Sequence, residues 1–201
     1  MTSDAGEAWP TWDLITEWLG EPGVDFELRP GETSPVHAED VATLTAARRF
    51  RDVLGRFASG VTVVTGLSDG RPVGLTCQSF ASVSLDPPLV LFVAARTSRA
   101  WPLIQLSGHF CVNFLDAGQA HLSNVMASRG VDKFAGVAWA PAPASGSPVL
   151  DGILGYVDCT IQAVHEAGDH HIVVGRVLDL ASTELTEPLL FFRGRYTTTR
   201  D

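Results

Sequence analysis

The segment with the clearest capacity for chemistry runs over residues 74–88, where small hydroxyl side chains lie between two apolar stretches and two prolines close the run. It contains neither a Walker lysine nor a G-x-G-x-x-G motif, so a phosphorylated ligand would be held there by peptide N–H groups and hydroxyls. Hydroxyl residues and a Pro-Pro turn also occur in strands that bind nothing. Taken alone, the segment therefore leaves a ligand loop and an ordinary strand turn as alternatives.

Two further groups of residues are candidates for such a site. Ser98 and Arg99 follow a predicted strand and open a predicted helix, where helix N–H groups and a guanidinium can converge on a phosphate. The alternative there is a helix cap beside a surface arginine. Asp169 and His170 follow a glycine in a turn, which is also ordinary hairpin chemistry. His171 would point to the opposite face of the strand.

The placement of cysteine and histidine predicts neither a disulfide framework nor a metal site. The three cysteines are far apart and form no C-x-x-C motif: Cys77, Cys111 and Cys159. Nothing around Cys77 indicates an activated thiol, so we interpret it as a small packing residue and not as a nucleophile. The histidines near residue 170 lack a third ligand at suitable spacing, and no metal is expected. This cysteine usage is typical of a reducing cytoplasm.

Composition limits the possible partners. The chain has 201 residues, of which 45% are hydrophobic, so it can bury the core of one domain. Its formal net charge is −9 and Lys133 is its single lysine. This balance argues against a nucleic acid or an anionic membrane as partner, because both attract clustered cations. The sequence opens without the pattern of a signal peptide and holds no apolar run long enough to span a membrane, so we expect an unexported, cytoplasmic protein.

The chain divides into two predicted parts. Residues 1–43 form an acidic extension with several tryptophans, in which residues 11–19 have the spacing of a short amphipathic helix. This extension either covers the chain's own barrel or a dimer seam, or it docks on a partner. Residues 44–201 form the predicted domain, which begins with a helix from residue 45 to about 57.

Within this domain, many short strands with few helices between them predict a mainly β, antiparallel barrel with added helices. The expected strands cover residues 61–65, 71–75, 80–84, 89–94 and 110–115, and the expected helices cover 98–106 and 117–128. A loop is expected at 140–148. It precedes a long hairpin over 153–182 that turns at 167–170, and closing strands at 189–199.

The order of the motifs along the chain is more specific than any one of them. The succession is Gly60-Val61-Thr62-Val63-Val64-Thr65, the segment 74–88, Phe110-Cys111-Val112-Asn113-Phe114-Leu115, Asp132-Lys133-Phe134, Gly168-Asp169-His170 and Arg193-Gly194-Arg195-Tyr196. Over residues 46–198 it resembles the short-chain NAD(P)H:flavin oxidoreductases, the flavin reductases that supply reduced flavin to two-component monooxygenases.

This resemblance implies a homodimeric, six-stranded Greek-key split barrel that binds FMN or FAD near the dimer interface and uses NADH or NADPH. It places Thr76, Cys77, Gln78 and Ser79 along the ribityl and phosphate portion of the flavin, with Ser82 and Val83 near the ring and Ser98 and Arg99 at a phosphate. It implies that Asp169 and His170 contact the nicotinamide nucleotide, with His170 as the catalytic candidate that orients the nicotinamide. Lesser candidates for cofactor contact are Lys133, Phe134, Arg195 and Tyr196. The pair Cys77-Gln78 departs from the small Thr-Ala-Ser-Ser type of sequence found more often in the family.

Three functions follow as alternatives. In the first, the protein reduces flavin with NAD(P)H and passes it to a partner monooxygenase. In the second, the flavin stays bound and the protein itself oxygenates or oxidises an organic substrate, so turnover would need no partner. In the third, the barrel binds flavin without nicotinamide access, and neither NADH nor NADPH would be oxidised.

Overall fold

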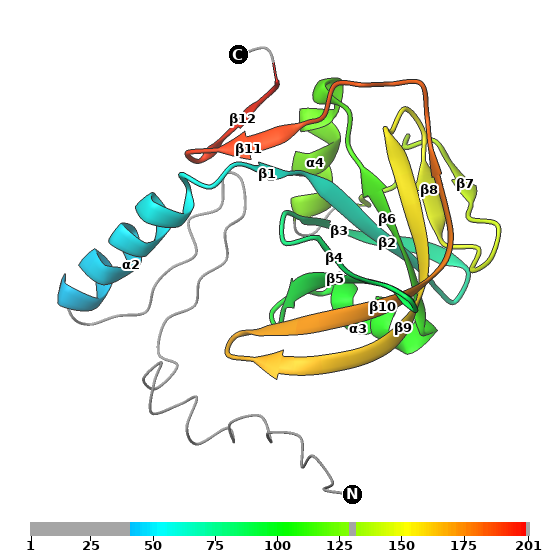
Figure 1. Ribbon diagram of the computed structural model, residues 1–201, viewed down its shortest axis with the longest axis horizontal. Helices are drawn as coiled ribbons and strands as arrows, with labels where there is room; N and C mark the ends of the chain where they lie inside the picture. The colour runs from blue at the N-terminus through cyan, green and yellow to red at the C-terminus, as the bar shows by residue number, and fades with distance from the viewer. Residues whose placement is uncertain (1–40, 129–131, 200–201) are drawn as a thin grey trace, which may run out of the picture.

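The computed structural model describes residues 41–128 and 132–199 (Figure 1). The predicted N-terminal helix over 11–19 lies outside these residues. The first described element is α2 (Val41–Leu54), which spans the boundary expected after residue 43. The helix ends at Leu54, before the predicted end at about residue 57. The amide of Gly55 donates a helical hydrogen bond to the carbonyl of Arg51 at 2.8 Å. Among the described residues, no helix is both long and apolar enough to cross a membrane.

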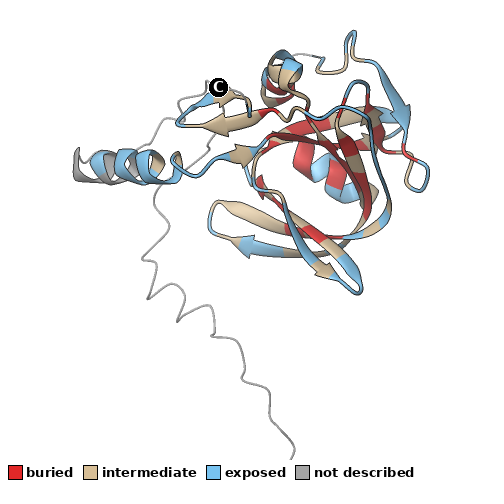
Figure 2. Cartoon of the chain, turned by 45° about the horizontal axis from the view of Figure 1, so that its top comes forward, coloured by how far each residue is buried: buried red, intermediate tan, exposed pale blue. Residues whose placement is uncertain are grey.

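One antiparallel sheet dominates the described part of the chain. Its strands follow the order β3-β2-β6-β9-β10-β5-β4, and every neighbouring pair is antiparallel. The strands are β2 (Thr62–Ser68), β3 (Arg71–Cys77), β4 (Ala81–Leu85), β5 (Pro88–Ala95), β6 (His109–Phe114), β9 (Gly155–Ala167) and β10 (His170–Ser182). The sheet curls around the buried side chains without closing, since β3 and β4 are its two edges (Figure 2). The predicted mainly β split barrel is therefore confirmed, with seven strands in this sheet instead of six.

Smaller elements surround the barrel. Helix α3 (Ala100–Ser107) follows β5, and a short 3-10 helix, η1 (Ala117–Gln119), leads into α4 (Ala120–Ala127), so the helix predicted at 117–128 has two parts. Strands β1 (Ser59–Gly60), β11 (Leu190–Phe192) and β12 (Arg195–Thr197) form a second sheet. Strands β7 (Trp139–Pro141) and β8 (Pro148–Leu150) pair where the sequence predicts a loop.

The barrel interior is packed with aromatic side chains. Phe92 lies edge-on to both Trp101 and Phe110, with ring centroids 5.8 and 5.0 Å apart, and all three side chains are buried. Gly175 on β10 leaves room for this cluster. A Cβ atom there would lie 2.3 Å from Cζ of Phe110, so the ring fits only against a residue without a side chain. The aromatic cluster thereby fixes how closely β10 approaches β6.

A buried asparagine connects three strands. Asn113 on β6 is fully buried, and its Nδ2 donates to the carbonyl of Val63 and to Oγ1 of Thr65, both at 3.1 Å. Its Oδ1 accepts the amide of Leu150 on β8 at 2.8 Å. Because buried polar groups without partners are costly, this single side chain ties β2 and β8 to β6.

Replacing Asn113 with Leu is expected to destabilise the fold by about 3 kcal/mol. The change removes the acceptor of the Leu150 amide and the side-chain donor to the Val63 carbonyl, and both groups are buried. The measurement is the free energy of unfolding in urea. The control is Gln162→Leu, an exposed amide on β9 that should change stability by less than about 0.5 kcal/mol. Equal effects of the two changes would show that Asn113 does not connect the strands as described.

Candidate functional site

A cavity of about 770 Å³ opens between β3, the end of β5, the start of α3, the end of α4 and the β9–β10 turn. Its size lies within the range of sites for small molecules and cofactors. It brings together most of the residues predicted from the sequence, although they come from four separate stretches of the chain: Thr76, Cys77, Gln78, Ser79, Ser98, Arg99, Lys133, Phe134, Asp169 and His170.

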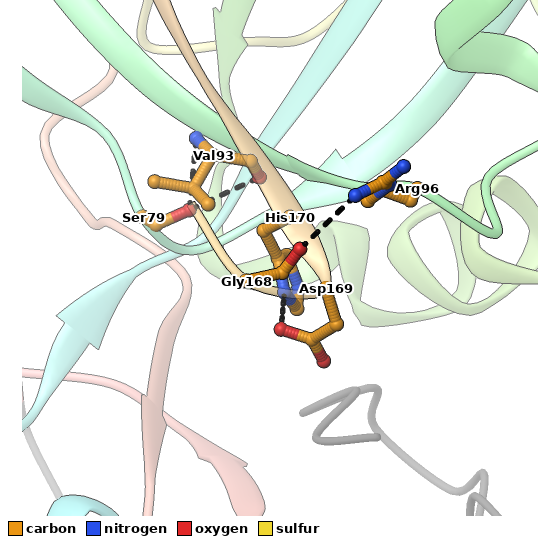
Figure 3. A network of polar contacts seen from close by, with 6 residues as sticks. All are labelled: Ser79, Val93, Arg96, Gly168, Asp169 and His170. Carbon is orange, nitrogen blue, oxygen red and sulfur yellow. Dashed lines mark hydrogen bonds and ion pairs between the residues drawn. The ribbon is translucent and has the colours of Figure 1, made fainter. Parts of the chain in front are cut away.

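The hydroxyl groups of the β3 wall are engaged within the protein. Oγ1 of Thr76 donates to the carbonyl of Ser123 on α4 at 2.6 Å. Oγ of Ser79 donates to the carbonyl of Val93 at 3.3 Å and accepts the amide of the same residue at 3.2 Å (Figure 3). Through these two hydrogen bonds, Ser79 connects the end of β3 to β5. What this wall offers a ligand is chiefly its backbone and its apolar surface.

Cys77 and Gln78 continue the same wall. Cys77 is 5% exposed, its Sγ lies 3.3 Å from Oγ of Ser79, and burial raises the pKa of its thiol. A raised pKa keeps the sulfur protonated, which supports a packing role. The Oε1 atom of Gln78 accepts a hydrogen bond from Ser59 at 3.3 Å. The Nε2 atom of Gln78 is shielded from solvent and finds no acceptor within the described part of the chain.

The opposite wall approaches β3 at Gly74. A Cβ atom on this residue would lie 3.3 Å from Sδ of Met126 and 3.4 Å from Cζ of Phe134, so any larger residue would crowd the cavity. Nζ of Lys133 donates to the carbonyl of Met126 at 2.6 Å and to that of Gly74 at 3.1 Å. The ammonium therefore connects β3 to the carboxyl end of α4. A cation is favourable at the carboxyl end of a helix.

The turn between β9 and β10 carries His170 to the cavity. It consists of two residues, because Ala167 pairs with His170, and Gly168 has a φ of +62°, which glycine adopts without strain. Nδ1 of His170 lies 2.7 Å from Oδ1 of Asp169 (Figure 3). With the carboxylate as acceptor, Nδ1 is the donor and Nε2 is left for another partner.

The neighbouring histidine faces the other way, as predicted. Nδ1 of His171 accepts a hydrogen bond from Nε1 of the buried Trp101 at 3.1 Å. At the start of α3, Oγ of Ser98 accepts the amide of Trp101 at 3.2 Å and so caps the helix. Arg99 is exposed, and its guanidinium has no hydrogen-bond partner among the described residues.

Four residues predicted to contact a cofactor do not line the cavity. Ser82 and Val83 are exposed on β4 at a break in its register, and Arg195 is exposed on β12. Oη of Tyr196 lies 2.8 Å from Oγ of Ser123 and 3.0 Å from Oδ1 of Asn124. Tyr196 therefore holds α4 in place, and α4 in turn accepts the hydroxyl of Thr76. Direct cofactor contact by these four residues stays a prediction.

The structure adds residues to the site that the sequence did not single out. Phe50 of α2, Thr97 and Met126 line the cavity, and Arg96 lies beside the turn that carries His170. In the sequence, Arg96 could have been noticed as a cation at the end of a predicted strand, two residues before Ser98. Within the described ranges, no group of three His, Cys, Asp or Glu side chains is arranged to hold a metal.

A curled antiparallel barrel with a cofactor-sized cavity between its edge strand and a hairpin turn defines a ligand-binding split-barrel protein. Residues 54–200 match the model of the family described as flavin reductase like domain, and the chain belongs to this family. It is 51% identical to the reductase subunit HsaB of a flavin-dependent monooxygenase from Rhodococcus jostii, over 75% of this chain and 76% of that protein. It is 42% identical to the FMN reductase (NADH) SmoA of Agrobacterium fabrum, over 75% of this chain and 84% of that one.

A solved structure shows the same fold. An NADH:FAD oxidoreductase of Streptomyces globisporus, in complex with NAD and FAD fragments, superposes with a TM-score of 0.72 at 36% identity. The superposition covers 80% of this chain and 96% of that one. The family resemblance inferred from the order of the motifs is therefore confirmed.

Proposed function

We propose that this protein is an NAD(P)H-dependent flavin reductase that supplies reduced flavin to a partner monooxygenase. The observation that carries the proposal is that β3 and the turn bearing His170 line the same cavity. Both halves lie within residues 54–200, which match the family to which the chain belongs. The relative from Rhodococcus jostii is the reductase subunit of a monooxygenase, which supports an oxygenase as recipient.

The residues present fit a flavin and a nicotinamide nucleotide. The cavity of about 770 Å³ is large enough for a planar ring system. The Nε2 atom of Gln78 is a buried donor without an acceptor among the described residues. Because an unpaired buried donor is costly, this amide favours a ligand that brings an oxygen or nitrogen acceptor.

When both cofactors are bound, the chemistry they supply is hydride transfer from the nicotinamide to the flavin. The protein's part is to hold the two rings in contact and to exclude water from between them. The Asp169–His170 pair fixes the imidazole at the cavity edge, where it can orient the nicotinamide.

The direct test follows absorbance at the nicotinamide band while NADH and NADPH are each combined with FMN and FAD. The named relatives use NADH with FMN in one case and with FAD in another, so all four pairs are assayed. At least one pair is expected to turn over without an organic substrate. Oxidation of neither nucleotide with either flavin would overturn the proposal, and turnover only with an organic substrate would favour an oxygenase that keeps its flavin.

Replacing His170 with Ala is expected to raise the KM for the nicotinamide nucleotide about 10-fold, because one oriented hydrogen bond to the nucleotide is lost. The dissociation constant of the flavin, measured by fluorescence quenching, should change by less than about 2-fold. His165→Ala is the matched control, since His165 is exposed on the same hairpin and lies outside the cavity lining. Unchanged kinetics in the His170 variant would remove this residue from the site.

We further propose that the protein is a cytoplasmic homodimer. Four large apolar side chains are exposed on α2 and the turn after it, at helical spacing: Phe50, Val53, Leu54 and Phe57, with exposed fractions of 46%, 58%, 45% and 80%. Contiguous apolar patches of this kind are typical of interfaces. Phe50 also lines the cavity, so a second copy seated on this face would cover one side of the site. Three free, buried cysteines fit a reducing compartment.

Replacing Val53 with Asp is expected to convert the dimer to monomer, because a charge would be buried in the apolar seam. The mass in solution is measured by light scattering at several protein concentrations. Arg48→Asp is the control, since Arg48 is exposed on the same helix outside the apolar set. A dimer that persists in the Val53 variant, or a wild-type monomer, would exclude α2 as the seam.

A further inference from the structure

Arg96 lies beside the turn that carries His170, between Ala95 and Thr97, which both line the cavity. It follows β5 directly, and its backbone amide donates to the carbonyl of Asp169 at 2.9 Å. The preceding residue, Ala95, pairs with His170 in the β5–β10 ladder. The side chain of Arg96 is therefore anchored at its base next to the residues proposed to meet the nicotinamide.

The guanidinium of Arg96 is largely uncommitted. Its one hydrogen bond within the described chain runs from Nη1 to the carbonyl of Gly168 at 3.5 Å, and the residue is exposed (Figure 3). A contact of this length is weak. The backbone bond to Asp169 already holds the turn, so the side chain is not needed for that purpose. Most of its five N–H donors are left to a ligand or to water.

The other cations at the cavity have different surroundings. The ammonium of Lys133 is bonded to two backbone carbonyls, which assigns it a structural task. Arg99 lies at the start of α3, where the family resemblance places a flavin phosphate. Arg96 is the cation beside the Asp169–His170 turn, and a chain of net charge −9 needs a local cation to attract an anionic nucleotide.

We infer that Arg96 binds the diphosphate of the nicotinamide dinucleotide beside the cavity. A guanidinium presents paired N–H donors that match phosphate oxygens, and because Arg96 is exposed, the phosphates can stay partly hydrated while the ring enters the cavity. The inference rests on the proposed reductase function and adds to it the residue that recognises the charged part of the nucleotide.

The experiment compares two hydride donors that differ in their phosphates. NADH carries the diphosphate, and reduced nicotinamide riboside carries none. In Arg96→Met, the KM for NADH is expected to rise about 10-fold, while the KM for the riboside and the KM for FMN change by less than 2-fold. Arg96→Lys should recover part of the loss. Added KCl should raise the KM for NADH less in Arg96→Met than in the wild type, because a screened charge pair is missing.

The matched control is Arg176→Met, an exposed arginine that pairs with Leu89 at the opposite end of the β5–β10 ladder from His170 and should leave all three KM values unchanged. Equal losses with NADH and the riboside would overturn the inference in favour of a role in holding the turn. A rise confined to the KM for FMN would assign Arg96 to the flavin phosphate instead, and no change would exclude it from the site. If the wild type oxidises NADH with flavin, the reductase proposal stands whichever of these results is obtained.

Discussion

Strand β5 is the constraint on which the site depends, because it is bonded to both segments that face each other across the cavity. On one side, Ser79 pairs its hydroxyl with both backbone groups of Val93. On the other, Ala95 pairs with His170, and the amide of Arg96 holds the carbonyl of Asp169. Val93 and Arg96 are separated by Ala94 and Ala95, so they lie three residue steps apart, a span of about 10 Å. The two walls therefore keep their separation unless hydrogen bonds of the sheet break.

Hydroxyl groups in the segment after Gly74 are bonded within the protein. Its residues suggest a cradle of side-chain donors, but Thr76 donates to Ser123 and Ser79 is paired with Val93. The hydroxyls organise the wall, and the surface left to a ligand is backbone, apolar side chain and the Nε2 donor of Gln78. A ring bound mainly by shape and stacking is held less tightly than one gripped by many charged groups. Such a surface suits a reductase that must release its flavin after each reduction.

Sequence reasoning recovered the antiparallel barrel and most of the site because its signals were local. The β-branched run after Gly60 and the turn at Gly168 define β2 and the β9–β10 hairpin with little help from the rest of the chain. The pairing of β7 with β8 was missed because Ala, Pro, Ser and Gly there follow no strand pattern. The hydrogen bond from the amide of Leu150 on β8 to Asn113 joins residues far apart in the sequence, so no local pattern indicates it. Tyr196 was expected at the cofactor, yet its hydroxyl bonds α4, a contact that only the tertiary fold reveals.

The cations near the cavity differ in whether their donors bond the protein or are open to a ligand. Lys133 is partly buried, and a cation in that position must be paired to offset its desolvation, which the carbonyls of Gly74 and Met126 accomplish. Arg99 lines the cavity and Arg96 lies beside it; both are exposed and incur no such cost, so their donors are available to anions. The proposed function places the ring of a cofactor inside the cavity and its phosphates beside these cations. Phosphates that stay partly hydrated incur a smaller desolvation cost than buried ones, so exposed arginines can bind them without the pairing that Lys133 needs.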